Sequence, residues 1–232
     1  MNYRCLVLDH DDTTVDSSPS IHHPAHVEQI RTIRPGMEPV SVLEWLYIQS
    51  DPGFGAYMFD VLKLTDAEMK VCQQIWRSYV DRIDPEFFPG MVDFLKEFHN
   101  AAGIVTVVTH SEADIVHRNY AARAAGLKPD LVIGWSDAPG KHKPDPWPLA
   151  EIMRTFGLER HDILVVDDQM PGIKMAQSAG VDSAAVGWGV NHPEVLNRIK
   201  EAATTFLPTV EALRAAVLPQ ASWTPGSFVT GN

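Results

Sequence analysis

Short apolar runs alternate with longer segments of helical periodicity along the chain from residue 89 onward. Uninterrupted apolar runs bounded by glycine or polar residues indicate buried strands, whereas apolar positions three or four residues apart indicate helices. The alternation predicts a helix at 91–101, a strand at 104–108, a helix at 112–125, a strand at 131–133, a helix at 147–156, a strand at 163–166, a helix at 173–179, a strand near 184–186 and a helix near 210–217. This order is typical of a parallel sheet flanked by helices.

A first strand, at residues 5–8, is separated from this alternation by a long helical segment. Residues 20–88 contain no convincing strand, and their periodicity predicts helices at 25–33, 42–48 and 66–82. Thr65 and Glu68 have the spacing of a capping box at the start of the third helix. An insertion of roughly seventy residues is longer than an ordinary loop.

We therefore expect an α/β fold, a Rossmann-like parallel sheet flanked by helices, with an inserted α-helical cap domain. The core domain would comprise residues 1–16 and 89–217, and the cap domain residues 17–88. Residues 218–232 show no periodicity and are expected to form a C-terminal tail.

Composition and charge narrow the class of protein. A chain of 232 residues, 45% of them hydrophobic, can bury a substantial core. Its net charge of −11 repels phosphate backbones and anionic lipid, so we expect no nucleic-acid or membrane partner, and a monomer or homodimer. The two cysteines form no close pair, and from the interruption by Asp9 we expect neither a signal peptide nor a membrane span. We therefore expect a cytoplasmic protein.

Acidic side chains are crowded at the end of the first strand, where Asp9, Asp11 and Asp12 occupy three of four positions. Their mutual repulsion makes it costly to ionise all three unless a cation lies nearby. In an open parallel sheet the carboxyl ends of the strands form the ligand-binding edge. The segments after the later strands add a hydroxyl group, an ammonium group and two carboxylates to that edge, those of Thr109, Lys143, Asp167 and Asp168.

These four segments, in this order, resemble the motifs of the haloacid dehalogenase superfamily. They are Asp9-His10-Asp11-Asp12-Thr13, Thr109, Lys143 and the pair Asp167-Asp168. The flanking text also agrees: "FFPGMVDFLKEF" resembles the return from a helical cap, "KPDPWPL" the lysine segment, and "MAQSAG" the helix after the last motif. The resemblance covers roughly residues 3–217 and points to the phosphoglycolate phosphatase and β-phosphoglucomutase branch.

The resemblance implies a Mg²⁺-dependent phosphatase that hydrolyses a small phosphorylated metabolite through an aspartyl-phosphate. Asp9 would attack phosphorus, and Asp11 would act as general acid and then as general base. Asp9 and Asp12 would raise the pKa of Asp11. The phosphoryl group would be held by Thr109, His110 and Lys143. The Mg²⁺ ligands would be Asp9, the main-chain carbonyl of Asp11, Asp168 and Asp167, with Asp168 the more direct of the last two.

Two motifs depart from the superfamily pattern, the first and the last. Asp12 occupies a place that is usually glycine, which tolerates left-handed backbone, and it adds a negative charge that could alter metal affinity. Asp167 also occupies a usual glycine position, while Gly172 stands where the GDxxxD form of the motif has its second acid.

Polar and aromatic residues of the cap leave alternatives open. His22, His23 and His26 could hold a metal ion, but Pro24 favours a polar helix start instead. Other cap residues could contact the leaving group, although the aromatic ones suit the cap core better: Arg31, Arg34, Trp45 and Tyr47.

Three other functions fit the same motifs. A sugar phosphomutase would use the same Asp9 and Asp11. A phosphonate hydrolase needs a cap lysine, and the cap offers Lys63 and Lys70. A non-catalytic scaffold on this fold is disfavoured because all the expected catalytic side chains are present.

Overall fold

The sheet is parallel throughout and six-stranded. The structure, a computed structural model, describes residues 2–136, 138–189 and 191–218. The strand order is β3-β2-β1-β4-β5-β6, with every neighbouring pair parallel. The strands are β1 (Cys5–Leu8), β2 (Ile104–Val108), β3 (Leu131–Ile133), β4 (Ile163–Asp167), β5 (Asp182–Val186) and β6 (Thr205–Leu207). The predicted α/β class is confirmed.

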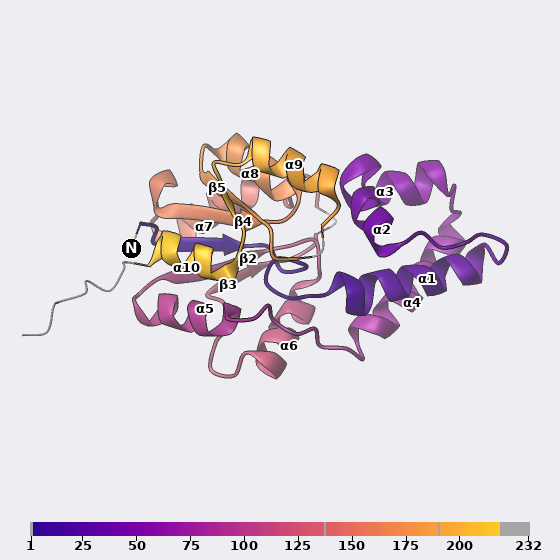
Figure 1. Ribbon diagram of the computed structural model, residues 1–232, viewed down its shortest axis with the longest axis horizontal. Coiled ribbons are helices and arrows are strands. Elements are labelled where there is room, and N and C mark those ends of the chain that lie inside the picture. Colours follow the sequence, from indigo (N-terminus) through magenta and orange to yellow (C-terminus); the bar gives the residue numbers. More distant parts are fainter. Residues whose placement is uncertain (1, 137, 190, 219–232) are drawn as a thin grey trace, which may run out of the picture.

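Helices cover both faces of this sheet (Figure 1). They are α5 (Met91–Asn100), α6 (Ala113–Arg123), α7 (Trp147–Phe156), α8 (Met170–Ala179), α9 (Pro193–Ala202) and α10 (Val210–Val217). A short 3₁₀ turn, Arg160–Asp162, leads into β4. We call the six strands and these helices the α/β core.

The central strand β1 is apolar at every position because both of its faces are buried. Successive side chains of a strand point to opposite faces. Leu6 and Leu8 pack with α5, α6 and α10, whereas Cys5 and Val7 pack with α7 and α8. The fixed sheet and its two helical layers hold the carboxyl end of β1 in place.

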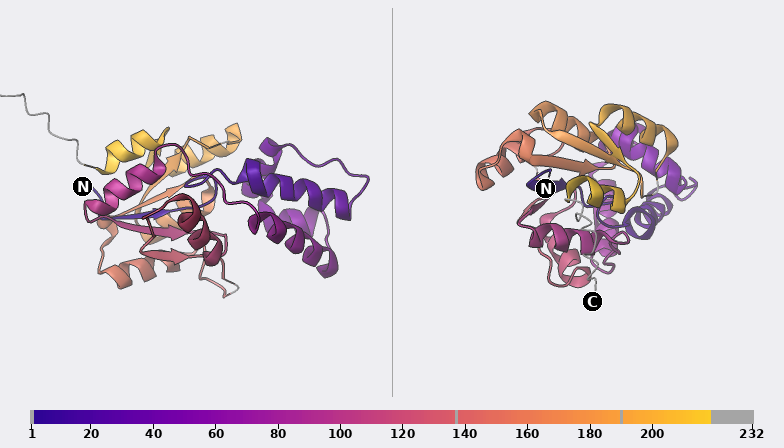
Figure 2. Two further views of the ribbon diagram at one scale, coloured as in Figure 1. Left: turned by 90° about the horizontal axis from the view of Figure 1, so that it is seen from below. Right: turned by 60° about the vertical axis from the view of Figure 1, so that its left-hand side comes forward.

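The segment between β1 and α5 is helical and lies beyond the carboxyl ends of the strands (Figures 1 and 2). We call residues 17–88 the helical insertion; its division from the core as a separate domain stays a prediction. It contains the helices α1 (His23–Ile33), α2 (Val42–Ile48), α3 (Phe54–Ala56) and α4 (Asp66–Val80), and the π-helical turns Ser18–His22, Gln49–Gly53 and Tyr57–Val61. The capping box of Thr65 and Glu68 at the start of α4 is confirmed.

The two connections between the insertion and the core pair with each other. The backbone N–H of Asp16 donates to the Glu86 carbonyl at 2.9 Å, and that of Phe88 donates to the Thr14 carbonyl at 3.2 Å. Val15 and Phe87 form an antiparallel bridge between them. The polypeptide therefore leaves and re-enters the core along one short ribbon.

Several predicted boundaries differ from the structure by a few residues, and some elements were not predicted, among them α3 and the short helical turns. Helix α4 ends at Val80 rather than at residue 82, and α8 begins three residues earlier than predicted. Helix α9 and strand β6 had no predicted counterpart. From residue 219 on, the predicted tail lies outside the described part of the chain. None of the helices in the described part of the chain is long and apolar enough to cross a membrane.

Candidate active site

The predicted site residues lie together beyond the carboxyl ends of β1, β2 and β4. Asp9 follows β1 directly, Thr109 follows β2, and Asp167 ends β4. Lys143 comes from the loop between β3 and α7. All four side chains are buried.

Lys143 lies between two carboxylates. Its Nζ is 2.8 Å from Oδ1 of Asp9 and 2.7 Å from Oδ2 of Asp167. Burial by itself would lower the pKa of Lys143, but the two carboxylates outweigh it and raise the pKa above its ordinary value. Lys143 is therefore a fixed positive charge beside the carboxylate of Asp9.

Asp9, Asp167 and Asp168 form a compact acidic cluster. Each offers a carboxylate oxygen, and these oxygens lie within 4.8 Å of one another. Burial raises the pKa of Asp167 to about 7 although Lys143 opposes the shift. Burial, with the charges of Asp9, Asp12 and Asp167, also raises the pKa of Asp168.

The cluster suits a small divalent cation. When all three carboxylates are ionised they outnumber the one ammonium group in a buried place, and a cation would relieve the repulsion that helps to raise the pKa of Asp167 and Asp168. Hard oxygen ligands are the ones that Mg²⁺ and similar ions prefer. The side chain of Asp11 is not part of the cluster, and a contribution from its main-chain carbonyl stays a prediction.

Thr13 fixes the orientation of Asp168. Its Oγ1 donates to Oδ1 of Asp168 at 2.9 Å and lies 3.1 Å from the Asp168 backbone nitrogen, which donates to it. Gln169 Nε2 donates to the other carboxylate oxygen at 3.3 Å. Because Thr13 follows β1 and Asp168 follows β4, this contact ties the first and last motifs together.

The side chain of Asp167 fills the space beside Gly172. A Cβ atom placed on Gly172 would lie 1.9 Å from Oδ2 of Asp167 and 2.4 Å from its Cγ. The carboxylate of Asp167 thus occupies the volume into which a side chain at position 172 would grow. The two departures from the GDxxxD form are therefore coupled, because the Asp167 side chain fits only when residue 172 has no side chain.

Thr109 and His110 differ in their exposure. Thr109 is buried, and its Oγ1 accepts a hydrogen bond from the Ser111 backbone N–H at 3.1 Å, which leaves its own O–H as a donor. His110 is exposed, and its Nε2 lies 3.0 Å from the Lys143 carbonyl oxygen. Partial desolvation of its side chain and the charge of Lys143 lower the pKa of His110. Substrate binding by either residue stays a prediction.

Asp11 is held by two groups that the sequence did not reveal. Its Oδ1 lies 3.0 Å from Nε2 of His22, and its Oδ2 accepts a hydrogen bond from Ser111 Oγ at 2.5 Å. Burial by itself would raise the pKa of Asp11, but the charge and hydrogen bond of His22, with that of Ser111, lower it. The expectation that Asp9 and Asp12 raise this pKa is wrong because these closer partners outweigh them.

Asp12 adopts the left-handed backbone that a glycine would favour, with φ of 55°. Its carboxylate accepts a hydrogen bond from the backbone N–H of Ser18 at 2.8 Å. Burial raises the pKa of Asp12 to about 6. Asp12 therefore links the loop after β1 to Ser18, the first residue of the insertion's opening turn.

The three neighbouring histidines of the insertion do not converge on one point. His22 contacts Asp11, His23 Nε2 lies 2.8 Å from the Val40 carbonyl oxygen, and His26 stacks on Trp45 with ring centroids 4.3 Å apart. Among the described residues they form no group able to hold a metal ion. Burial lowers the pKa of His26 to about 4, so its ring is neutral.

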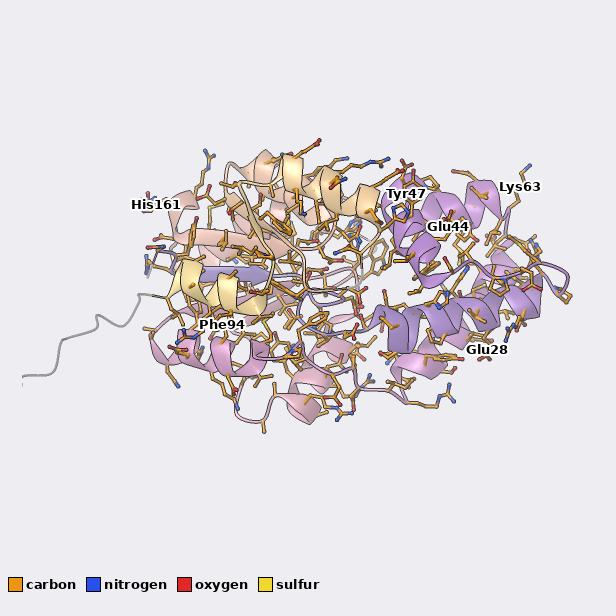
Figure 3. The ribbon with its side chains drawn as sticks, viewed as in Figure 1. Glu28, Glu44, Tyr47, Lys63, Phe94 and His161 are labelled. Carbon is orange, nitrogen blue, oxygen red and sulfur yellow. The ribbon has the colours of Figure 1, made fainter. Side chains whose placement is uncertain are left out.

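The other residues proposed to contact the leaving group have different surroundings. Trp45 belongs to the apolar core of the insertion, and Arg34 is paired with Glu68. Tyr47 lies on the side of the insertion that faces α9 (Figure 3), with its ring 4.9 Å from that of His192. A contact of Arg31 with the substrate stays a prediction.

A family model and known relatives match much of the chain. The family model for haloacid dehalogenase-like hydrolases matches residues 7–186. Phosphoglycolate phosphatase 1 of Pseudomonas aeruginosa is 29% identical over 60% of this chain, which spans 53% of that relative's length. Phosphoglycolate phosphatase of Photorhabdus laumondii is 25% identical over 82% of this chain and 83% of its own.

A solved structure shows the same fold. The crystal structure of a predicted phosphoglycolate phosphatase from Haemophilus somnus superimposes with a TM-score of 0.73. It covers 89% of this chain and 94% of its own, at 18% sequence identity.

Proposed function

The chain belongs to the haloacid dehalogenase-like hydrolase family, and from this premise we propose that it is a Mg²⁺-dependent phosphatase acting on a small phosphomonoester. The observation that supports this most directly is the position of Lys143, 2.8 Å from the carboxylate of Asp9 inside a buried acidic cluster. A carboxylate is a poor nucleophile toward a phosphate dianion unless positive charge offsets their repulsion.

In the first step a carboxylate oxygen of Asp9 attacks phosphorus. A bond forms between that oxygen and phosphorus, and the bond from phosphorus to the leaving oxygen breaks. Asp11 gives its proton to the leaving alkoxide, which departs as an alcohol. Lys143 and the hydroxyl of Thr109 hold the phosphoryl oxygens as charge develops on them.

In the second step water attacks the phosphorus of the aspartyl-phosphate. Asp11, now ionised, accepts a proton from that water, and the bond between phosphorus and Asp9 breaks. Inorganic phosphate leaves, and both carboxyl groups return to their initial states. His22 and Ser111 lower the pKa of Asp11 and so favour its ionised form, which is the form that enters this second step, whereas the first step uses the protonated form.

Asp9, Asp167 and Asp168 would hold Mg²⁺, with the main-chain carbonyl of Asp11 as a further ligand. When bound, the ion would neutralise charge on the transferring phosphoryl group. Thr13 would keep Asp168 oriented toward it.

The alternatives are separated by particular residues. A sugar phosphomutase would use the same Asp9 and Asp11, and product analysis distinguishes it. A phosphonate hydrolase needs a cap lysine near the substrate, but Lys63 and Lys70 are exposed, and Lys63 lies on the side of the insertion away from the core (Figure 3). A scaffold without activity would have no need for the buried pairing of Lys143 with Asp9.

The substrate is proposed as a small phosphorylated metabolite. The relatives named above include phosphoglycolate phosphatases, which makes small phosphorylated acids the first compounds to test. Cytoplasmic location also stays a prediction, supported by two buried cysteines that are both free.

A phosphomonoester panel tests the proposal. Purified protein should release inorganic phosphate from at least one small substrate in Mg²⁺ and none in excess chelator. Asp9→Asn keeps the size of the side chain and should reduce release to background. Full turnover in chelator, or an active Asp9→Asn variant, would refute the proposed chemistry.

A further inference from the structure

The carboxylate of Asp11 is bound from two sides of the molecule. His22, the last residue of the π-helical turn Ser18–His22, lies 3.0 Å from Oδ1 through its Nε2. Ser111, in the loop after β2, donates to Oδ2 at 2.5 Å. One oxygen is therefore held by the helical insertion and the other by the α/β core. With both oxygens bound, the plane of the carboxylate is fixed.

Trp76 of helix α4 determines which nitrogen of His22 bears the proton. Its indole Nε1 lies 3.2 Å from Nδ1 of His22. An indole N–H can only donate, so Nδ1 of His22 must accept. In the neutral ring the proton is then on Nε2, the nitrogen that faces Asp11. Burial lowers the pKa of His22, but Asp11, Asp12 and Asp9 raise it. The Trp76 N–H, in contrast, disfavours a second proton on Nδ1. Trp76, His22 and Asp11 thus form a chain of hydrogen bonds that runs in one direction.

This chain crosses the contact between the insertion and the core. Trp76 packs against an apolar cluster in which Ile21 and Val80 of the insertion meet Ile115 of α6. The cluster holds Trp76 and the turn that ends at His22 against the core. If the insertion moves away from the core, Asp11 loses the donor on its Oδ1 and keeps the hydrogen bond from Ser111.

We infer that His22 is a positioning residue that acts through Asp11, that Trp76 fixes its tautomer, and that Asp11 is fully oriented only while the insertion contacts the core. The inference rests on the proposed function, in which Asp11 transfers the protons. Neither His22 nor Trp76 is required to touch the reacting phosphorus. Their effect should therefore appear only in steps that need Asp11.

Conservative variants distinguish the loss of a hydrogen-bond donor to Asp11 from the loss of side-chain volume. His22→Gln keeps a side-chain N–H donor, whereas His22→Leu keeps volume without one. Trp76→Phe removes only the indole N–H and retains an aromatic ring. Tyr79→Phe is the matched control, because it removes a hydrogen-bonding group from the same helix, where Tyr79 Oη donates to Glu28 and not to Asp11. Thermal melts identify any variant that fails to fold.

The readout is pre-steady-state release of p-nitrophenol from p-nitrophenyl phosphate, together with steady-state hydrolysis of an alkyl phosphate. The aryl group leaves without a proton, so phosphorylation of Asp9 should be little changed in His22→Leu. Hydrolysis of the phosphoenzyme should slow by about 10- to 100-fold, giving a burst, by analogy with groups that orient catalytic ligands. Phosphoenzyme hydrolysis should be slowed less in His22→Gln than in His22→Leu, and it should be several-fold slower than in the parent in Trp76→Phe. In Tyr79→Phe the rate should equal that of the parent.

A double variant decides whether His22 acts through Asp11. In the Asp11→Asn background, His22→Leu should change turnover by less than about twofold, because the group it orients is already gone. The inference would be overturned if the two substitutions reduced turnover multiplicatively, or if His22→Leu slowed aryl and alkyl substrates equally without a burst. Either result would leave the proposed function intact. An Asp11→Asn variant that never forms a phosphoenzyme would instead count against the proposed function itself.

Discussion

The closest packing in the site is that of Gly172 against Asp167, where an added Cβ would lie 1.9 Å from a carboxylate oxygen. Gly172→Ala should therefore destabilise the protein by about 1–3 kcal/mol, the usual cost of overpacking. It should also reduce activity, because Asp167 would have to leave its position 2.7 Å from Lys143. Urea unfolding and phosphate release would measure the two effects.

The control for this prediction removes the Asp167 side chain, with which the added methyl group would collide. In an Asp167→Gly background the added methyl group has room, so Gly172→Ala should then cost little stability. Equal costs in the two backgrounds would show that the collision is not with Asp167.

The residues that follow the strands could be predicted from the sequence, but the partners of Asp11 could not. Asp9, Thr109 and Asp167 follow apolar runs directly, and parallel strands bring such positions to one edge. His22 and Ser111 reach Asp11 only after the insertion has packed on the core. The sequence suggested a polar helix start for His22 and offered no signal for Ser111. The pKa expectation for Asp11 failed for the same reason.

At the scale of elements, helix α4 contacts the core through an ion-pair network as well as through apolar packing. Arg77 is paired with Glu112 and Asp114 at the start of α6, the second of these at 3.1 Å, and with Asp81 at 3.0 Å in its own segment. These groups are partly exposed, so each pair contributes only about 0.2–1 kcal/mol to stability. Their larger effect should be on the closed arrangement of insertion and core.

Arg77→Gln should therefore raise KM about three- to tenfold and leave the melting temperature almost unchanged. High salt should produce the same increase in the parent protein, because it screens exposed charges. Arg82→Gln is the control, since Arg82 Nε donates to the Ser78 carbonyl within the same segment. An Arg77→Gln variant with parental KM at low salt would contradict this role.

Elements with an uninterrupted apolar run or a clear apolar spacing were predicted well, and elements with a weak apolar pattern were not. The apolar runs of the largely buried β2 and the half-buried β3, and the apolar spacing of α7, gave the observed bounds. Strand β6 has only three residues, the first of them exposed, so neither length nor alternation identified it. Helix α9 begins at Pro193, and its two buried residues, Val195 and Ile199, gave too weak a pattern in a polar segment.

At the scale of the whole molecule, the buried acidic cluster makes the free energy of unfolding depend on pH and on metal binding. Asp167 has a pKa of about 7 in the folded protein, and that of Asp168 is also raised, so the folded state binds more protons than the unfolded chain above about pH 4. The metal-free protein should lose this contribution to stability as pH rises from about 4 through 7. Mg²⁺ competes with those protons, so its stabilising effect should grow over the same range.

Thermal melts in Mg²⁺ and in chelator would measure this effect. The difference in melting temperature should be small at pH 5 and largest at pH 8, where Mg²⁺ at one hundred times its Kd would stabilise by about 2.7 kcal/mol. Protonation of His26, whose pKa is about 4, affects both samples alike and cancels. Asp168→Asn should reduce the difference at pH 8. A difference that does not vary with pH would show that the cluster does not bind the metal.

The central claim is that Asp9 becomes phosphorylated and that Asp11 is needed to release the phosphate. The most direct measurement is rapid-mixing kinetics of Asp11→Asn with p-nitrophenyl phosphate, followed by peptide mass analysis. We predict a burst of about one p-nitrophenol per enzyme, then slow turnover, with the added phosphate on the peptide containing Asp9. Steady turnover at the parental rate, or a phosphorylated peptide that lacks Asp9, would contradict the account.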